Sequence, residues 1–222
     1  MRVSININLK IGRVVKYFVL SDFFLLAGWG FIDPVFSVFI VQRVVGGTLA
    51  TVGIAAGIYW ILKSVLQIPI ANYLDRTEGE RDDFMALVGG LLLVGISAIA
   101  MCWVTQIWEL YLIHAVHAVA FALYFASWPT IFSRHLDKNR ISFDWSLDSA
   151  AAGIASGVTG ILGGIIAETY GFTLVFVLAG ILAFIAAFVL LAVPDLILPK
   201  PTTPEEKGEA ANNHIPGDVA VK

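Results

Sequence analysis

Apolar residues run through this chain in long unbroken stretches, without the three-to-four spacing of a helix that covers a soluble core. Short polar or charged turns separate six such stretches. As a helix, a stretch of about 20 residues crosses the ~30 Å apolar layer of a bilayer and satisfies its own backbone hydrogen bonds. The pattern therefore predicts membrane-spanning helices over residues 17–40, 49–74, 84–104, 108–132, 146–169 and 171–193.

Composition agrees with lipid as the main surroundings. Hydrophobic residues make up 58% of the chain, the mean hydropathy is +0.83, and charged residues make up 14%, against about 25% in a soluble domain. The single cysteine, Cys102, excludes an internal disulfide framework. His214 alone gives no metal-site pattern, and we expect no metal, no cofactor and no nucleic-acid partner.

Basic residues fix the expected orientation. Every Lys and Arg except Arg43 and Lys63 falls on the side of the two termini and of the 75–83 and 133–145 turns. The positive-inside rule places that side in the cytoplasm of a cell-membrane protein. We expect a cytoplasmic segment at 1–16, a six-helix domain at 17–193 and a disordered cytoplasmic tail at 194–222. The N-terminal sequence does not resemble a cleaved signal peptide.

Ionisable side chains fall in only four of the predicted helices. Each costs about 2.5–3.5 kcal/mol at mid-membrane, so it is expected to face a cavity or a partner. The spans 84–104 and 171–193 carry none and are expected to face lipid. The ionisable residues of the other four spans are Asp22, Asp33, Lys63, Glu109, His114, His117, Asp148 and Glu168.

The order of two polar helices and one apolar helix occurs twice along the chain. Pro34 and Pro129 also recur at matching helices, as do glycine pairs that allow close helix approach. This favours an all-α membrane fold of two inverted three-helix repeats. The glycines expected to pack helices are Gly53, Gly57, Gly153, Gly157, Gly160 and Gly164.

A substrate or proton site is expected in the outer half of the membrane. Asp33 and two histidines on one helix face, His114 and His117, lie at similar depth, and histidine suits proton handling. The alternative is a pair of hydrogen-bonded structural histidines. The full candidate set is Asp33, His114, His117, Lys63, Trp29 and Tyr124.

The other ionisable residues have simpler expected roles. Asp22 lies near the cytoplasmic end of its helix and is expected to reach water, as is Glu168 at the outer end. Asp144 and Asp148 start the fifth helix, where negative charge suits the helix dipole. Lys63 is expected to pair with Asp33 or a partner chain, or to extend toward the membrane surface.

The loop "ANYLDRTEGERDD" at 71–83 and the segment "GVTGILGG" at 157–164 resemble motifs of the major facilitator superfamily. The loop matches in type at Ala71, Asp75, Arg76, Gly79 and Arg81. The resemblance implies one half of a twelve-helix transporter, with Asp75 in a cytoplasmic gate that meets a helix N-terminus of the opposite half. The alternative is a solvated turn whose charges only fix orientation.

We therefore expect a half-size secondary-transporter subunit that moves a small solute by alternating access, with proton coupling left open. The closest alternative is a non-transporting accessory or scaffold membrane protein. An intramembrane protease is disfavoured, because the only histidine after Ser156 is His214 in the tail. Six helices hardly enclose an aqueous path, so pairing is expected with a second copy or with another six-helix half; the remaining alternative is a truncated, inactive copy.

Overall fold

The computed structural model describes residues 11–76 and 80–192. Within these ranges the chain is almost entirely helical, and each predicted span matches one long helix, several of them starting a few residues earlier than expected. The expected tail and Gly79 of the gate loop lie outside the described residues. The elements are α1 (Arg13–Arg43), α2 (Leu49–Leu74), α3 (Arg81–Ala100), η1 (Met101–Trp103), α4 (Ile107–Arg134), α5 (Ile141–Tyr170) and α6 (Phe172–Leu191).

Local side-chain caps set the helix ends at the connections between α1 and α2 and between η1 and α4. The Thr48 hydroxyl oxygen accepts a hydrogen bond from the backbone N–H of Thr51 at 3.3 Å, and the Thr51 hydroxyl oxygen accepts one from the backbone N–H of Thr48 at 3.1 Å. The Glu109 carboxylate accepts from the N–H groups of Thr105 and Gln106 at 2.8 and 2.9 Å. These bonds satisfy N–H groups that have no partner inside the helix.

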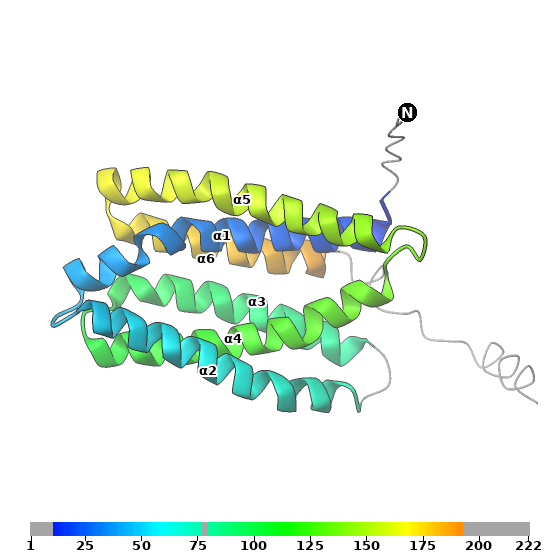
Figure 1. Ribbon diagram of the computed structural model, residues 1–222, viewed down its shortest axis with the longest axis horizontal. Coiled ribbons are helices and arrows are strands. Elements are labelled where there is room, and N and C mark those ends of the chain that lie inside the picture. Colours follow the sequence, from blue (N-terminus) through cyan, green and yellow to red (C-terminus); the bar gives the residue numbers. More distant parts are fainter. Residues whose placement is uncertain (1–10, 77–79, 193–222) are drawn as a thin grey trace, which may run out of the picture.

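The helices pack as two groups of three (Figure 1). Helix α1 packs mainly against α5 and α6, and α4 packs mainly against α2 and α3, while α3 and α6 join the groups. Exchanging α1 with α4, α2 with α5, and α3 with α6 maps one set of contacts onto the other. This correspondence supports the expected repeat of two three-helix units.

Helices α3 and α6 lie behind α1 and α4 in the view of Figure 1. About half of each is buried inside the bundle, against 22% of α2 and 17% of α5. The expectation that α3 and α6 are the lipid-facing helices is therefore only half correct, because their inner faces form much of the core. The least covered helices are α2 and α5, two of the four that carry ionisable residues.

Close helix contacts depend on glycines other than those expected. Gly30 and Gly163 lie where α1 and α5 cross, and a Cβ atom added at Gly163 would overlap the Phe31 carbonyl oxygen and stand 3.0 Å from its carbonyl carbon. Gly180 similarly lets α6 approach α3. Five of the six predicted packing glycines have no neighbour within 4 Å of an added Cβ, and Gly160 has only the Gly30 carbonyl at 3.6 Å. Within this chain they face open space.

Adjacent glycines on α5 provide a matched test of this packing. The substitution Gly163→Ala should destabilise the protein by about 1–3 kcal/mol, because the new methyl group meets the backbone of Phe31. The substitution Gly164→Ala should be neutral or stabilising by up to about 1 kcal/mol, because its space is open and alanine favours a helix. Thermal unfolding of both variants in mild detergent measures the difference; equal stability would contradict the α1–α5 contact.

Candidate functional site

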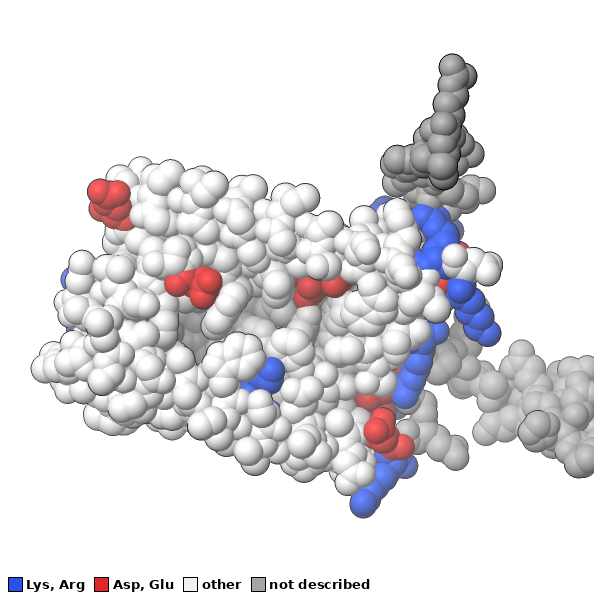
Figure 2. Space-filling view, viewed as in Figure 1, with Lys and Arg blue, Asp and Glu red and all other residues white. Residues whose placement is uncertain are grey.

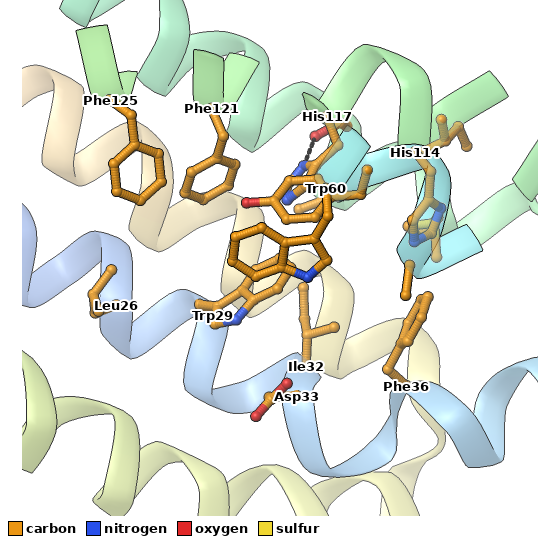
Figure 3. Close-up of a pocket in the computed structure, with 16 residues that line it drawn as sticks. Leu26, Trp29, Ile32, Asp33, Phe36, Trp60, His114, His117, Phe121 and Phe125 are labelled. Carbon is orange, nitrogen blue, oxygen red and sulfur yellow. Dashed lines mark hydrogen bonds between the residues drawn. The ribbon is translucent and has the colours of Figure 1, made fainter. Parts of the chain in front are cut away.

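A pocket of about 360 Å³ lies between α1, α2 and α4, with part of α3 as its floor. Figure 3 shows side chains from these helices converging on it. Its walls are mostly apolar, and the polar groups among them are few: Asp33, Ser97, His114, His117 and the polar atoms of the aromatic residues. The aromatic residues that line it are Trp29, Phe36, Tyr59, Trp60, Phe121 and Phe125.

Helical periodicity brings these side chains to one place. On α4, His114, His117, Phe121 and Phe125 are spaced by three or four residues, so they lie on one face. Residues Trp29, Asp33 and Phe36 on α1 repeat the same spacing. The two faces meet across the pocket, where the Trp29 ring stacks on His117 with centroids 5.2 Å apart and planes 15° from parallel.

His117 is held by Ser97 of α3. The Ser97 hydroxyl donates to the Val94 carbonyl at 2.9 Å, so the His117 Nδ1–H donates to the Ser97 oxygen at 2.6 Å. This arrangement leaves Nε2 of neutral His117 with a free lone pair. Nε2 is buried and has no hydrogen-bond partner among the described residues. It is therefore a buried acceptor at the pocket wall whose hydrogen-bonding capacity the described residues leave unused.

His114 lies one turn away on the same face. Its Nδ1–H donates to the Leu110 carbonyl at 2.8 Å, and its ring centroid lies 5.1 Å from that of Phe36. The hydrogen bonds of both histidines also fit the alternative that His114 and His117 only stabilise the fold. Asp33 is exposed on the α1 side of the pocket, and Trp29 and Ile32 stand between it and the histidines in Figure 3. The three predicted residues thus share a pocket without contacting one another directly.

Lys63 does not pair with Asp33 in the described structure. Its side chain is 8% exposed, and its Nζ lies 4.1 Å from the ring centre of Phe125 and 4.7 Å from that of Trp60. Both rings also line the pocket. Cation–π attraction to these rings therefore takes the place of an ion pair with Asp33, one of the three expected alternatives.

Two predictions about carboxylates are wrong. Asp22, expected to reach water, is 6% exposed and accepts a short hydrogen bond from the Tyr124 hydroxyl. Tyr124, predicted to belong to the pocket, does not line it. Asp148, expected to cap α5, is 7% exposed and lies two turns inside that helix. Contacts between helices bury these groups, and no pattern within a single helix reveals them. An aspartate in the first span and a tyrosine in the fourth were the only available signal.

Charged residues gather at the end of the bundle that carries the α2–α3 and α4–α5 connections (Figure 2). Arg134 at the end of α4 pairs with Asp83 at 2.9 Å and with Glu80 at 3.7 Å. Part of the acidic 75–83 loop is thereby tied to its own half of the molecule. Asp75 and Arg76 are exposed at the end of α2, which leaves the Asp75 carboxylate accessible.

Comparison with known proteins agrees with the helical arrangement. The sequence profile of the Major Facilitator Superfamily matches residues 18–217. The chain therefore belongs to this superfamily of membrane transporters, which are not enzymes, and it is a multi-pass membrane protein. Comparison with curated proteins finds no match.

Solved transporters share the fold. The peptide transporter POT in complex with sulfate has a TM-score of 0.71 and 19% identity, over 95% of this chain and 45% of its own. A mutant of that transporter in complex with alafosfalin has a TM-score of 0.69 and 19% identity, and the match covers 90% of this chain and 44% of the transporter. The POT family transporter PepTSo has a TM-score of 0.67 and 11% identity, and the match covers 96% of this chain and 44% of the transporter. This chain spans less than half the length of each.

Proposed function

We propose that this chain is a half-size subunit of a secondary transporter, and that the pocket between α1 and α4 binds a small solute during alternating access. The observation that carries the proposal is the pocket itself. It lies between spanning helices, and its lining includes a buried histidine nitrogen that the described residues leave without a hydrogen-bond partner. Polar groups of this kind inside spanning helices mark a solute or ion pathway.

The lining suggests which solutes fit. Stacked rings around Trp29 and Tyr59 favour a flat or apolar group. The His117 Nε2 accepts a hydrogen bond from an N–H or O–H of the solute, and Asp33 at the rim favours a positive charge. Proton coupling is part of the proposal, because aspartate and histidine side chains inside spanning helices are the usual components of proton relays in transporters. The solved relatives named as peptide transporters make a peptide-like solute a suitable first test.

A second six-helix half would complete the path. The outer faces of α2 and α5 are largely uncovered, and Gly53, Gly57, Gly153 and Gly157 present open space there. Close approach of another bundle to these glycines would cover the pocket from the open side. A second copy of this chain and a different six-helix chain both meet that need. We place the charged end in the cytoplasm of a cell membrane, because lysine and arginine gather there.

The alternative is an accessory or scaffold protein without transport. Such a protein has no use for a pocket with an unsatisfied buried acceptor, whereas a transporter does. Solute binding in the pocket, and alternation of its accessibility, distinguish the two functions.

Solute binding is tested by a thermal-shift screen of the purified protein against classes of small solutes, beginning with short peptides. A solute that raises the unfolding temperature should bind the Trp29→Ala variant at least about tenfold more weakly, a loss of about 1.4 kcal/mol. Trp108→Ala is the matched control, because Trp108 is 65% exposed and outside the pocket. Equal stabilisation of both variants would remove the pocket from the proposal.

Pairing is tested by cysteine crosslinking in membranes, in a Cys102→Ser background. Gly53→Cys on α2 and Gly153→Cys on α5 should crosslink to a second half, whereas Ile181→Cys on the outer face of α6 should not. Native mass spectrometry from mild detergent should show a dimer or a co-purifying membrane protein. A strictly monomeric species in both experiments would exclude the half-size subunit.

The gate is tested by Asp75→Asn, which removes the charge proposed to meet a helix N-terminus of the other half. We expect a shift toward inward-open forms, measured as faster labelling of Ala56→Cys in the pocket by an impermeant thiol reagent from the cytoplasmic side. The control is Asp137→Asn, the same charge change at the same end of the molecule. Unchanged labelling in Asp75→Asn would leave the loop as an orientation signal only.

A further inference from the structure

A second group of polar side chains lies in the bundle outside the pocket. Asp22 of α1, Tyr124 of α4 and Asp148 of α5 are 6, 5 and 7% exposed, and we refer to them as the Asp22 cluster. Asp22 precedes the pocket residue Trp29 by two helical turns, roughly 10 Å at 1.5 Å per residue. The Asp22 cluster therefore lies closer than the pocket to the charged end.

The cluster has more acceptors than donors. The Tyr124 hydroxyl donates to Asp22 Oδ1. Asp148 interacts electrostatically with Asp22 and Tyr124, but its Oδ1 is buried without a hydrogen-bond partner among the described residues. The one hydroxyl donor thus serves Asp22, and Asp148 Oδ1 is left without a donor. A proton on one carboxylate supplies the missing donor and removes one of the two charges.

Charged groups on the surrounding helices are engaged elsewhere. On α2, the Lys63 ammonium lies on the rings of Phe125 and Trp60. At the end of α4, Arg134 pairs with Asp83 and Glu80 of the α3 end.

Neither Asp144 of α5 nor any side chain of α6 offers a positive charge to Asp22 or Asp148. On α5, Asp144 accepts from the N–H of Asp137. The sequence of α6 contains no ionisable side chain. Within the part of the chain that the structure describes, Asp22 and Asp148 interact electrostatically with each other and with Tyr124.

We propose that the Asp22 cluster is a proton-binding site, separate from the pocket, through which the transport cycle uses the proton gradient. Asp22 stays ionised and accepts from Tyr124, while Asp148 binds and releases the proton. The role in transport rests on the proposed function, whereas proton binding itself does not.

Ring contacts connect the cluster to the pocket. Tyr124 contacts Phe121 with ring centroids 5.8 Å apart, and Phe121 contacts His117 at 4.9 Å. The cluster also joins three helices, so a shift of α1 or α4 against α5 changes the surroundings of Asp148. Proton binding and the opening of the pocket are expected to favour each other by the same free energy in both directions.

Proton binding is tested without a solute by infrared spectroscopy of the full chain in lipid nanodiscs during a pH titration. A protonated carboxylic acid has a carbonyl band apart from those of carboxylates and amides. We expect one such band to disappear as the pH rises, to shift on labelling with aspartate enriched in ¹³C at the side-chain carboxyl, and to be absent in Asp148→Asn. Asp137→Asn, a control for an exposed carboxyl outside the helices, should keep the band.

Tyr124→Phe should move the midpoint of the titration, because Asp22 loses its donor. A titration without any carbonyl band, or a band that persists in both Asp22→Asn and Asp148→Asn, would overturn the proposal. A band that appears only when sodium ions are removed would also overturn it, because the cluster would then bind sodium. If a variant fails to fold, the isotope label in the unsubstituted protein still shows whether a titrating aspartate is present, and a band that does not shift with the label overturns the proposal.

Coupling is tested by labelling Ala56→Cys in the pocket, in the Cys102→Ser background, as a function of pH. We expect the labelling rate to change severalfold across the infrared transition and to become independent of pH in Asp148→Asn. Labelling that depends equally on pH in both proteins would overturn the coupling role. A failed solute screen alongside a titrating Asp148 band would count against the proposed solute pocket and leave the proton site intact.

Discussion

The crossing of α1 with α5 is the contact on which the arrangement of the polar groups depends. Gly30 and Gly163 bring the two backbones together, and the Ser156 hydroxyl donates to the Leu26 carbonyl at 3.0 Å across the same crossing. In lipid, such packing and hydrogen bonds replace the hydrophobic effect as the force between helices. With α1 fixed against α5, its opposite face is directed at α4. Trp29 then meets His117, and Asp22 meets Tyr124.

The polar groups form two levels along the bundle. One level is an open pocket whose polar atoms are spread around aromatic rings, and the other is a cluster of two acids and a tyrosine that interact electrostatically. The first arrangement suits a molecule with some apolar surface, whereas the second suits a proton. Separation of the levels by about two helical turns allows solute and ion to bind without competing for the same atoms. Contact through Phe121 still links them.

Much of the fold followed from the sequence, because lipid imposes a strong rule on length and hydropathy. The spans, their number in the described residues and the family resemblance through the Asp75 loop are confirmed. The predicted glycines did not pack within the chain, because a small-residue spacing does not show which neighbour uses it. Asp22 and Asp148 were misjudged for a related reason: depth along a helix can be counted, but the partner across the bundle appears only when the helices are assembled.

The open faces of α2 and α5 have a consequence for how such a protein works in a cell. If a separate molecule closes the pocket, assembly obeys mass action in the plane of the bilayer. The fraction of complete units then rises with the surface density of the chain and falls as the membrane expands around a fixed number of copies. A transporter with both halves in one polypeptide has no such dependence, whereas the proposed pairing of two chains would make the level of synthesis itself a regulator of flux.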